Sequence, residues 1–167
     1  MVERSLSNDR EVRLRAAAEA DHGALARLID EWWGERRPRV ARFWFRHFAR
    51  LSWIAERADG RPVGVAIGAR GYDRPSTGLL VLVAVAPSQR RRGVGRSLVE
   101  AVWRSLESAG TTSLEATIWP GNRVGVRFLE ALEFVPAPEA GEQLYGVPAI
   151  ADFDGEGEDR AIFVRGR

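Results

Sequence analysis

Along this chain, short stretches with the two-residue period of strands alternate with stretches that have the wider spacing of helices. Glu11–Ala16 (EVRLRA) alternates apolar and charged side chains, which predicts a half-exposed strand. Apolar residues recur on one face between Asp21 and about Trp33, which predicts a helix. Asp21 stands at its start and is expected to cap it. The apolar residues are Leu25, Leu28, Ile29 and Trp32.

The next part of the chain predicts a second helix and a hairpin. Val40–Leu51 is rich in Phe and Trp and is expected to be helical. Trp53–Arg57 and Pro62–Ala69 have the composition of strands, and the Asp59-Gly60 pair between them is a strong signal for a tight turn.

The middle of the chain predicts a buried strand followed by a helix. Leu79–Ala86 is a continuous apolar run, which suits a central strand that is covered on both faces. Gly95–Ala109 is expected to be an amphipathic helix, with Gly110 as its C-terminal cap.

The remainder continues the same alternation. Ser113–Ile118 predicts a strand, and Asn122–Leu132 predicts a helix with Val124, Phe128 and Leu132 in register. Two late strands are expected at Phe134–Ala137 and Ala161–Arg165. The pattern therefore favours one mixed α/β domain over residues 11–167, preceded by a flexible N-terminus at residues 1–10.

Composition narrows the chemistry more than it narrows the fold. The chain of 167 residues has no cysteine and no lysine, so all 25 basic residues are arginine. A thiolate metal site, a cysteine nucleophile, a Schiff-base lysine and a lysine base are thereby excluded. The net charge is only +2, and the arginines are dispersed among 23 acids, which argues against nucleic-acid binding. With no long apolar stretch and no signal-peptide core, we expect a cytoplasmic protein that does not bind membranes.

The most informative segment is Val83–Leu98 (VAVAPSQRRRGVGRSL), in which a strand end is followed by three arginines, two glycines and a helix. Free N–H groups at a helix start, together with the helix dipole, form an anion site, and phosphate is its natural ligand. A P-loop is excluded because it needs Gly-Lys-Ser/Thr. A dinucleotide fingerprint is disfavoured because Leu98 stands at the third glycine position.

This segment resembles the acyl-CoA-binding motif of the GNAT (GCN5-related N-acetyltransferase) superfamily, Gln/Arg-x-x-Gly-x-Gly/Ala after a Val-x-Pro strand end. Here the motif is Arg90-Arg91-Arg92-Gly93-Val94-Gly95, preceded by Val85-Ala86-Pro87. A second family signature is matched by Asn122, Phe128 and Glu133-Phe134, although the family has Gly at the position of Glu133. The resemblance implies a mixed sheet of about six or seven strands, flanked by about four helices, with a splayed central strand pair.

The resemblance also implies where acetyl-CoA would bind. In the family, the pantetheine arm lies between the splayed strands and pairs with backbone groups, as an added strand would. The pyrophosphate would lie on backbone amides from Arg91 through Ser97. The expected acetyl-CoA contacts are Val83, Ala84, Val85, Arg90, Arg91, Arg92, Gly93, Val94, Gly95, Arg96, Ser97, Asn122 and Phe128, and no metal is expected.

The implied reaction is direct attack of a neutral amine on the thioester, which needs a base, an oxyanion donor and a proton for the thiolate. Many family members supply that proton from a Tyr at the position that is Leu129 here. Glu115, a carboxylate inside a strand, is the best candidate base, and Tyr145 is the candidate acid. The alternatives for Glu115 are a solvated strand end or a partner for an arginine, and the alternative for Tyr145 is a packing tyrosine.

Two questions about the acceptor stay open at this point. Asp152–Asp159 places five acids in eight residues, which would steer a cationic amine or simply form a solvated loop. The favoured function is acetyl-CoA-dependent N-acetylation of a primary amine on a small molecule. The alternatives are acetylation of protein N-termini or lysines, and a catalytically weak acyl-CoA-binding regulatory module. Family members often dimerise through late strands, so a homodimer is compatible with the resemblance.

Overall fold

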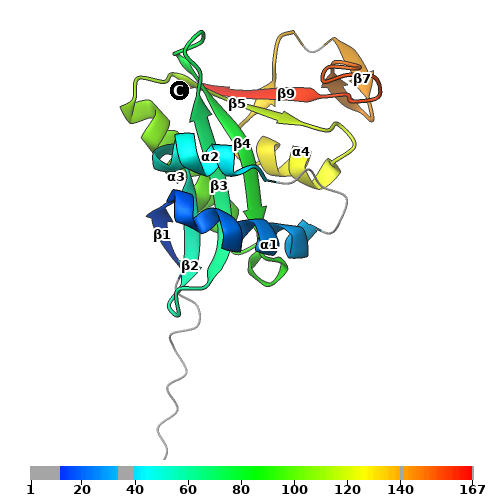
Figure 1. Cartoon of the computed structure of the whole chain (residues 1–167). Coiled ribbons are helices and arrows are strands. Elements are labelled where there is room, and N and C mark those ends of the chain that lie inside the picture. Colours follow the sequence, from blue (N-terminus) through cyan, green and yellow to red (C-terminus); the bar gives the residue numbers. More distant parts are fainter. Residues whose placement is uncertain (1–11, 34–39, 140, 167) are drawn as a thin grey trace, which may run out of the picture. The chain divides into compact units, whose positions relative to one another are not determined.

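The computed structural model describes residues 12–33, 40–139 and 141–166 (Figure 1). The flexible N-terminus expected at residues 1–10 lies outside these described residues. The chain divides into two compact units. The first holds the chain up to Ala69 together with Leu82–Ser108, and the second holds Arg70–Val81 together with Ala109–Arg167.

Among its described residues, the first unit contains the three N-terminal strands and three α-helices. The strands form a meander in which β1 pairs antiparallel with β2, and β2 pairs antiparallel with β3. The β2–β3 turn has the predicted Asp59-Gly60 pair, and Gly60 adopts a φ of +78°. The elements are β1 (Val12–Ala16), a 3-10 turn (Glu19–Asp21), α1 (His22–Trp33), α2 (Arg42–Phe48), a second 3-10 turn (Ala49–Leu51), β2 (Trp53–Arg57), β3 (Pro62–Arg70) and α3 (Val94–Ser108).

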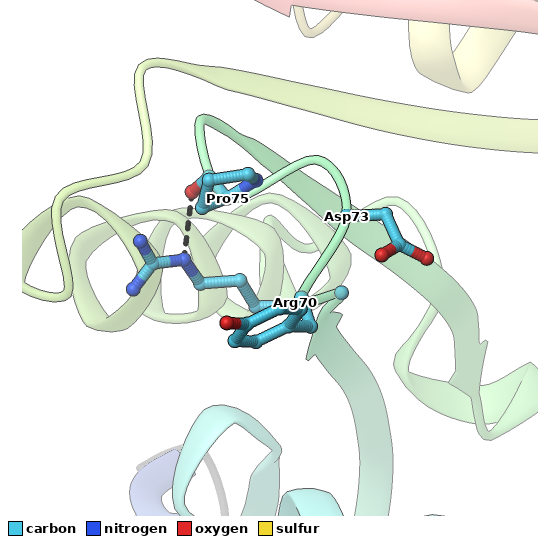
Figure 2. Close-up of a pocket in the computed structure, with 5 residues that line it drawn as sticks. Arg70, Asp73 and Pro75 are labelled. Carbon is cyan, nitrogen blue, oxygen red and sulfur yellow. Dashed lines mark hydrogen bonds between the residues drawn. The ribbon is translucent and has the colours of Figure 1, made fainter.

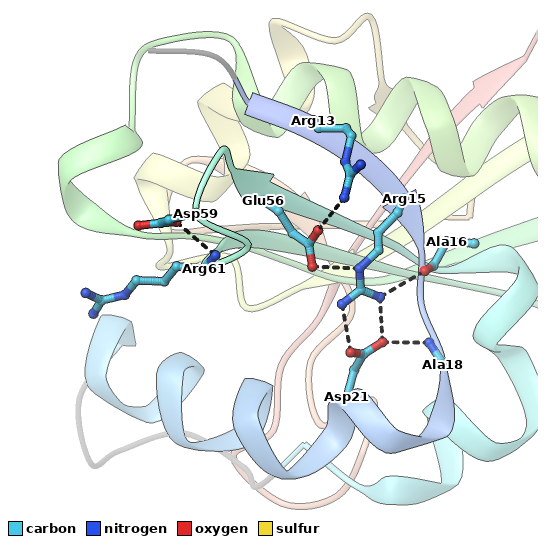
Figure 3. Close-up of polar contacts among 8 residues, drawn as sticks. All are labelled: Arg13, Arg15, Ala16, Ala18, Asp21, Glu56, Asp59 and Arg61. Carbon is cyan, nitrogen blue, oxygen red and sulfur yellow. Dashed lines mark hydrogen bonds and ion pairs between the residues drawn. The ribbon is translucent and has the colours of Figure 1, made fainter. Parts of the chain in front are cut away.

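An ion-pair network ties β1 to β2 and to the start of α1 (Figure 3). Arg15 Nε donates to Glu56 Oε1 at 2.6 Å, and its two terminal nitrogens donate to the carboxylate of Asp21 at 2.8 Å each. Glu56 is buried and is also contacted by Arg13 at 3.4 Å. The hydrogen bonds from Arg15 lower the pKa of Asp21 below its usual value. Asp21 therefore accepts from Arg15 and from the Ala18 N–H, rather than capping α1 as the sequence suggested.

Helix α3 packs closely on β3 because glycines face it. An added Cβ at Gly64 would lie 2.9 Å from Leu98 Cδ1 and 3.2 Å from Val94 Cγ1. At Gly68 it would overlap the Leu51 carbonyl oxygen and lie 2.7 Å from Val102 Cγ1. These two glycines let the first turns of α3 approach the sheet, which fixes the position of the segment that leads into the helix.

The second unit contains the late strands and one α-helix. β5 pairs antiparallel with β9, and β6 pairs antiparallel with β9. A small hairpin of β7 and β8, which the sequence pattern did not predict, precedes β9. The elements are β5 (Ser113–Ile118), α4 (Arg123–Glu130), β6 (Val135–Pro136), β7 (Glu142–Leu144), β8 (Val147–Ala149) and β9 (Ala161–Gly166).

Strand β4 (Thr77–Val85) contributes residues to both units. The order of the seven-stranded mixed sheet is β1-β2-β3-β4-β5-β9-β6, which confirms the predicted α/β fold with a mixed sheet and four α-helices. The parallel register of β4 and β5 runs from Thr77↔Ser113 to Leu80↔Ala116, while β4 itself continues to Val85.

Two predictions of burial were wrong. Val124 is 82% exposed, and the buried positions of α4 are Val126 and Leu129 instead. β4 was expected to be covered on both faces, yet Val81, Leu82, Val83 and Val85 are each only partly buried. Among the described residues, no helix is long and apolar enough to cross a membrane.

Candidate functional site

The segment between β4 and α3 forms a tight loop that ends in a helix N-terminus. The Ala86 N–H donates to the Val63 carbonyl at 2.8 Å, which anchors the end of β4 to β3. A short 3-10 turn (Pro87–Gln89) follows. Arg91 and Gly93 both adopt left-handed backbone conformations, with φ of +62° and +83°. The chain thus reverses twice within a few residues before α3 begins at Val94.

This geometry leaves a row of backbone donors at the start of a 15-residue helix. The first intrahelical bond runs from the Ser97 N–H to the Gly93 carbonyl at 3.0 Å. The first N–H groups of α3 lack an intrahelical acceptor, because a helix leaves its first four amides outside its own hydrogen-bond ladder. These amides and the helix dipole favour an anion. The amide of Ser97, which was also predicted to bind phosphate, is committed to the helix, so its hydroxyl is the group left to contribute.

A hollow of about 260 Å³ lies against this loop. It is lined by backbone and side chains of the loop and the first turn of α3, together with two residues of β1. The lining residues are Val12, Leu14, Gln89, Arg92, Gly93, Val94 and Ser97. An added Cβ at Gly93 would meet no atom within 4 Å, so this glycine is required by its backbone conformation rather than by crowding.

The end of β4 presents alternating peptide groups to its two edges. Since Ala86 donates to β3, Ala84 directs its N–H and C=O to β3 as well, because consecutive residues of a strand face opposite edges. Val83 and Val85 therefore face the other edge. Of the three residues predicted to pair with pantetheine, the geometry favours Val83 and Val85, whereas the peptide groups of Ala84 face β3.

The loop arginines are placed differently from one another. The guanidinium of Arg90 donates to two backbone carbonyls, Val85 O at 3.0 Å and Trp32 O at 2.9 Å. All four arginines of this segment, Arg90, Arg91, Arg92 and Arg96, are exposed. Of the three consecutive arginines, Arg90 is thus engaged with the protein backbone, and the next two face solvent beside the helix N-terminus.

The predicted pantetheine residues Asn122 and Phe128 lie on α4 in the second unit. Asn122 is the N-cap of α4, where its side-chain oxygen accepts from the Gly125 N–H at 3.0 Å. Its amide NH2 group remains as the ligand-binding candidate. Phe128 is half-buried. Leu129 is 4% exposed and packs in the core, so this apolar position of α4 offers no proton donor.

Glu115 is buried in β5 and pairs with an arginine, which was one of the two alternatives left open by the sequence. Its Oε2 lies 3.2 Å from Arg74 Nη2. In the parallel pairing of β4 with β5, Glu115 lies opposite Leu79, which is near the start of β4 and four residues before Val83. Arg74 belongs to the loop after β3, and the sequence carried no signal that linked it to Glu115.

Tyr145 lies at the tip of the β7–β8 hairpin in a strained conformation, with a φ of +54°. It is 57% exposed and its ring meets Trp119 edge-on, with the centroids 5.5 Å apart. Trp119 directly follows β5 and is 49% exposed. Trp119 was not among the residues predicted from the sequence, although an aromatic residue just after a central strand was the available signal.

The acidic segment Asp152–Asp159 is a structured turn whose charges are largely committed. Arg160 Nε lies 2.7 Å from Asp154 and its Nη2 lies 2.7 Å from Glu158. Asp152 accepts from the Gly157 N–H at 2.6 Å. These ion pairs and hydrogen bonds reduce the negative field that the acids of this segment were expected to present to a cationic amine.

A second and larger hollow, of about 870 Å³, lies on the loop after β3 (Figure 2). Its lining includes Arg70, Tyr72, Asp73 and Pro75. The Arg70 guanidinium is engaged in holding the loop, because it donates to the Pro75 carbonyl at 2.7 Å and to the Ala109 carbonyl. Volume alone therefore does not identify the functional site. Among the described residues, no cluster of three metal-binding side chains occurs.

Comparison with known proteins agrees with the loop geometry. The profile of the acetyltransferase (GNAT) family matches residues 14–134. An L-2,4-diaminobutyric acid acetyltransferase of Nocardia farcinica is 36% identical over 53% of this chain and 46% of its own length. A mycothiol acetyltransferase of Clavibacter michiganensis is 39% identical over 47% of this chain and 23% of its own length. The chain thus spans about half the length of the diaminobutyric acid acetyltransferases it matches.

Solved structures share the fold over nearly the whole chain. A GNAT-family acetyltransferase from Desulfovibrio desulfuricans has a TM-score of 0.75 at 22% identity, over 93% of this chain and 99% of that one. A diaminobutyrate acetyltransferase from Paenibacillus lautus, bound to L-2,4-diaminobutyric acid and coenzyme A, has a TM-score of 0.68 at 24% identity, over 93% and 95%. From its loop geometry, its fold and the match over residues 14–134, this chain belongs to the acetyltransferase (GNAT) family.

Proposed function

We propose that this protein is an acetyl-CoA-dependent N-acetyltransferase that transfers the acetyl group to a primary amine of a small molecule. The observation that carries the proposal is the loop at residues 91–95, which turns through left-handed conformations at Arg91 and Gly93 and leads from the end of β4 into the N-terminus of α3, in a chain of the GNAT family. Family membership and two kinds of small-amine acetyltransferase among the relatives support it.

The residues present fit acetyl-CoA. Its pyrophosphate would accept from the amides of residues 91–95, with the exposed guanidinium groups of Arg91 and Arg92 adding charge. Its pantetheine arm would pair with the outward-facing peptide groups of Val83 and Val85, as an added strand. Asn122 and Phe128, on α4 of the second unit, are the further pantetheine contacts that the resemblance to the family implies.

The chemistry requires three functions from the protein. The thioester supplies an activated acetyl group. An outward-facing N–H of β4, from Val83 or Val85, would stabilise the negative charge that develops on the thioester oxygen. The attacking amine must lose a proton, for which Glu115 is the proposed acceptor. Tyr145 is the proposed proton donor to the departing thiolate.

The small-molecule acceptor is favoured over a protein acceptor by the relatives, whose names specify diaminobutyric acid and mycothiol. A catalytically weak acyl-CoA-binding module remains the second candidate, because Leu129 is buried where many family members carry a tyrosine. The two functions differ in whether bound acetyl-CoA is consumed.

The test is a screen of the purified protein with acetyl-CoA against primary amines, including L-2,4-diaminobutyric acid and peptides with free N-termini or lysines, following thiol release. Turnover on a small amine is expected. Tight coenzyme A binding without thiol release on any acceptor would favour the binding module, and preference for the peptides would favour the protein acetyltransferase.

Catalytic roles are tested with matched variants. Glu115→Gln and Tyr145→Phe should each lower kcat by roughly 100-fold or more, the usual range for loss of a general base or acid. Arg74→Gln separates the base from the ion pair, because it removes the partner of Glu115 and keeps the carboxylate. Glu142→Gln and Tyr72→Phe are exposed controls that should keep wild-type rates. Wild-type rates in Glu115→Gln or Tyr145→Phe would exclude that residue from catalysis.

A further inference from the structure

Arg90 differs from the two arginines that follow it because its side chain turns back onto the protein. The guanidinium donates through Nε to Val85 O at 3.0 Å and through Nη2 to Trp32 O at 2.9 Å. Nε and Nη2 lie on the same edge of the planar guanidinium, so this one edge donates to both carbonyls. Two neutral carbonyls therefore occupy the edge that would otherwise meet a phosphate.

Both acceptors lie at element ends that need a donor. Trp32 is the penultimate residue of α1, and the last four carbonyls of a helix have no intrahelical partner. A cation at that position also complements the negative end of the helix dipole. Val85 is the last residue of β4 and faces away from β3, so its carbonyl has no donor from that strand. Arg90 satisfies both carbonyls at once.

We propose that Arg90 is a positioning residue that holds the outward edge of β4 against the end of α1, and is not a ligand of the pyrophosphate. The inference rests on the proposed function and specifies how its acyl-CoA strand is built. Because Arg90 fixes the Val85 carbonyl, the peptide groups of Val83 and Val85 stay directed toward the edge of β4 that faces away from β3. An acyl-pantetheine arm that pairs along this edge therefore meets a preorganised partner.

The three arginines should contribute to binding of different parts of the acetyl donor. Arg91 and Arg92 are exposed beside the helix N-terminus, so their contribution should depend on the pyrophosphate. The contribution of Arg90 should depend on the pantetheine arm alone, because it acts through Val85. A thioester that lacks the pyrophosphate therefore distinguishes the two roles.

The experiment compares acetyl-CoA with S-acetylpantetheine as donors for wild type, Arg90→Ala, Arg90→Lys and Arg92→Ala. Arg90→Ala should lower kcat/KM by about tenfold with both donors, from the loss of two charge-assisted hydrogen bonds. Arg90→Lys should stay closer to Arg90→Ala than to wild type, because lysine keeps the charge but lacks the planar edge. Arg92→Ala should lose activity with acetyl-CoA, and the loss should largely disappear with S-acetylpantetheine.

A second readout does not need turnover. Calorimetric titration with coenzyme A and with pantetheine, and amide hydrogen exchange at the end of α1, should show weaker binding of both ligands and faster exchange in Arg90→Ala and Arg90→Gln. Failure of the proposed function would appear instead as no binding or turnover in wild type. A loss confined to coenzyme A ligands and restored by Arg90→Lys would make Arg90 a phosphate ligand. Unchanged binding of both ligands would also overturn the proposal.

Discussion

Glu133 occupies a backbone position that suits glycine, and replacing it with glycine should stabilise the protein. It adopts a φ of +66° just after α4. The Phe134 N–H returns to the Leu129 carbonyl at 3.1 Å and the Glu133 N–H to the Glu130 carbonyl at 2.9 Å. These bonds close the end of the helix around one left-handed residue, a position where helices most often carry glycine.

The size of the effect follows from two opposing contributions. The left-handed conformation costs a residue with a side chain about 1–2 kcal/mol. Glycine gives back roughly 0.4–1 kcal/mol of this through the greater entropy of the unfolded chain. The net gain in the free energy of unfolding for Glu133→Gly is therefore about 0.5–1 kcal/mol, which for a chain of this length raises Tm by roughly 1–4 °C.

Urea unfolding, followed by circular dichroism, measures this directly against a matched control. Glu130→Gly removes the same charge three residues earlier, at the last residue of α4, where the backbone is not left-handed, and should cost about 0.5–1 kcal/mol. Glu133→Ala should be nearly neutral, because alanine keeps the strained conformation. The opposite signs of Glu133→Gly and Glu130→Gly are the decisive result. A Glu133→Gly variant no more stable than wild type, beside a destabilised Glu130→Gly, would refute the argument.

Two further predictions concern stability. Because the folded-state pKa of Asp21 is lowered below its usual 3.8, its pairing stabilises the fold at pH above that value and is lost as the pH falls through the folded-state pKa. Arg15→Met should thus lower the free energy of unfolding by about 2 kcal/mol at neutral pH, less than the loss of a fully buried pair because Arg15 is one-third exposed. The difference in unfolding free energy between this variant and wild type should shrink in acid. A difference that does not depend on pH would exclude this linkage. Gly68→Ala should cost roughly 2–3 kcal/mol in urea unfolding because its Cβ overlaps the Leu51 carbonyl, whereas Gly23→Ala, with open space, should not destabilise; equal stability of the two variants would contradict the packing.

Much of the fold could be predicted from the sequence because its elements are local and strongly periodic. The β2–β3 hairpin was predicted by Asp59-Gly60, and α3 by its apolar face and by Gly110, whose φ is +88°. The β7–β8 hairpin was missed because its strands have only three residues each, too few for a period to appear. Val124 was placed on the wrong face because α4 is short and its phase depends on packing rather than on pattern.

The site was predictable in its backbone but not in its side chains. Two glycines and a helix start suffice to indicate an anion site, whereas the Trp32 partner of Arg90 and the Arg74 partner of Glu115 lie 58 and 41 residues away in sequence. Such pairings depend on how elements pack, which no local pattern encodes. Glu133 shows the same limit, since only the structure reveals that it takes the left-handed position of a family glycine.

The most direct test of the central claim is calorimetric titration of acetyl-CoA into wild type and Gly95→Glu. The variant adds bulk and negative charge among the amides proposed to bind the pyrophosphate. Gly23→Glu is the matched control, at an exposed glycine with open space around it. The account predicts binding to wild type and Gly23→Glu and severe loss in Gly95→Glu. Unchanged affinity in a folded Gly95→Glu would contradict it.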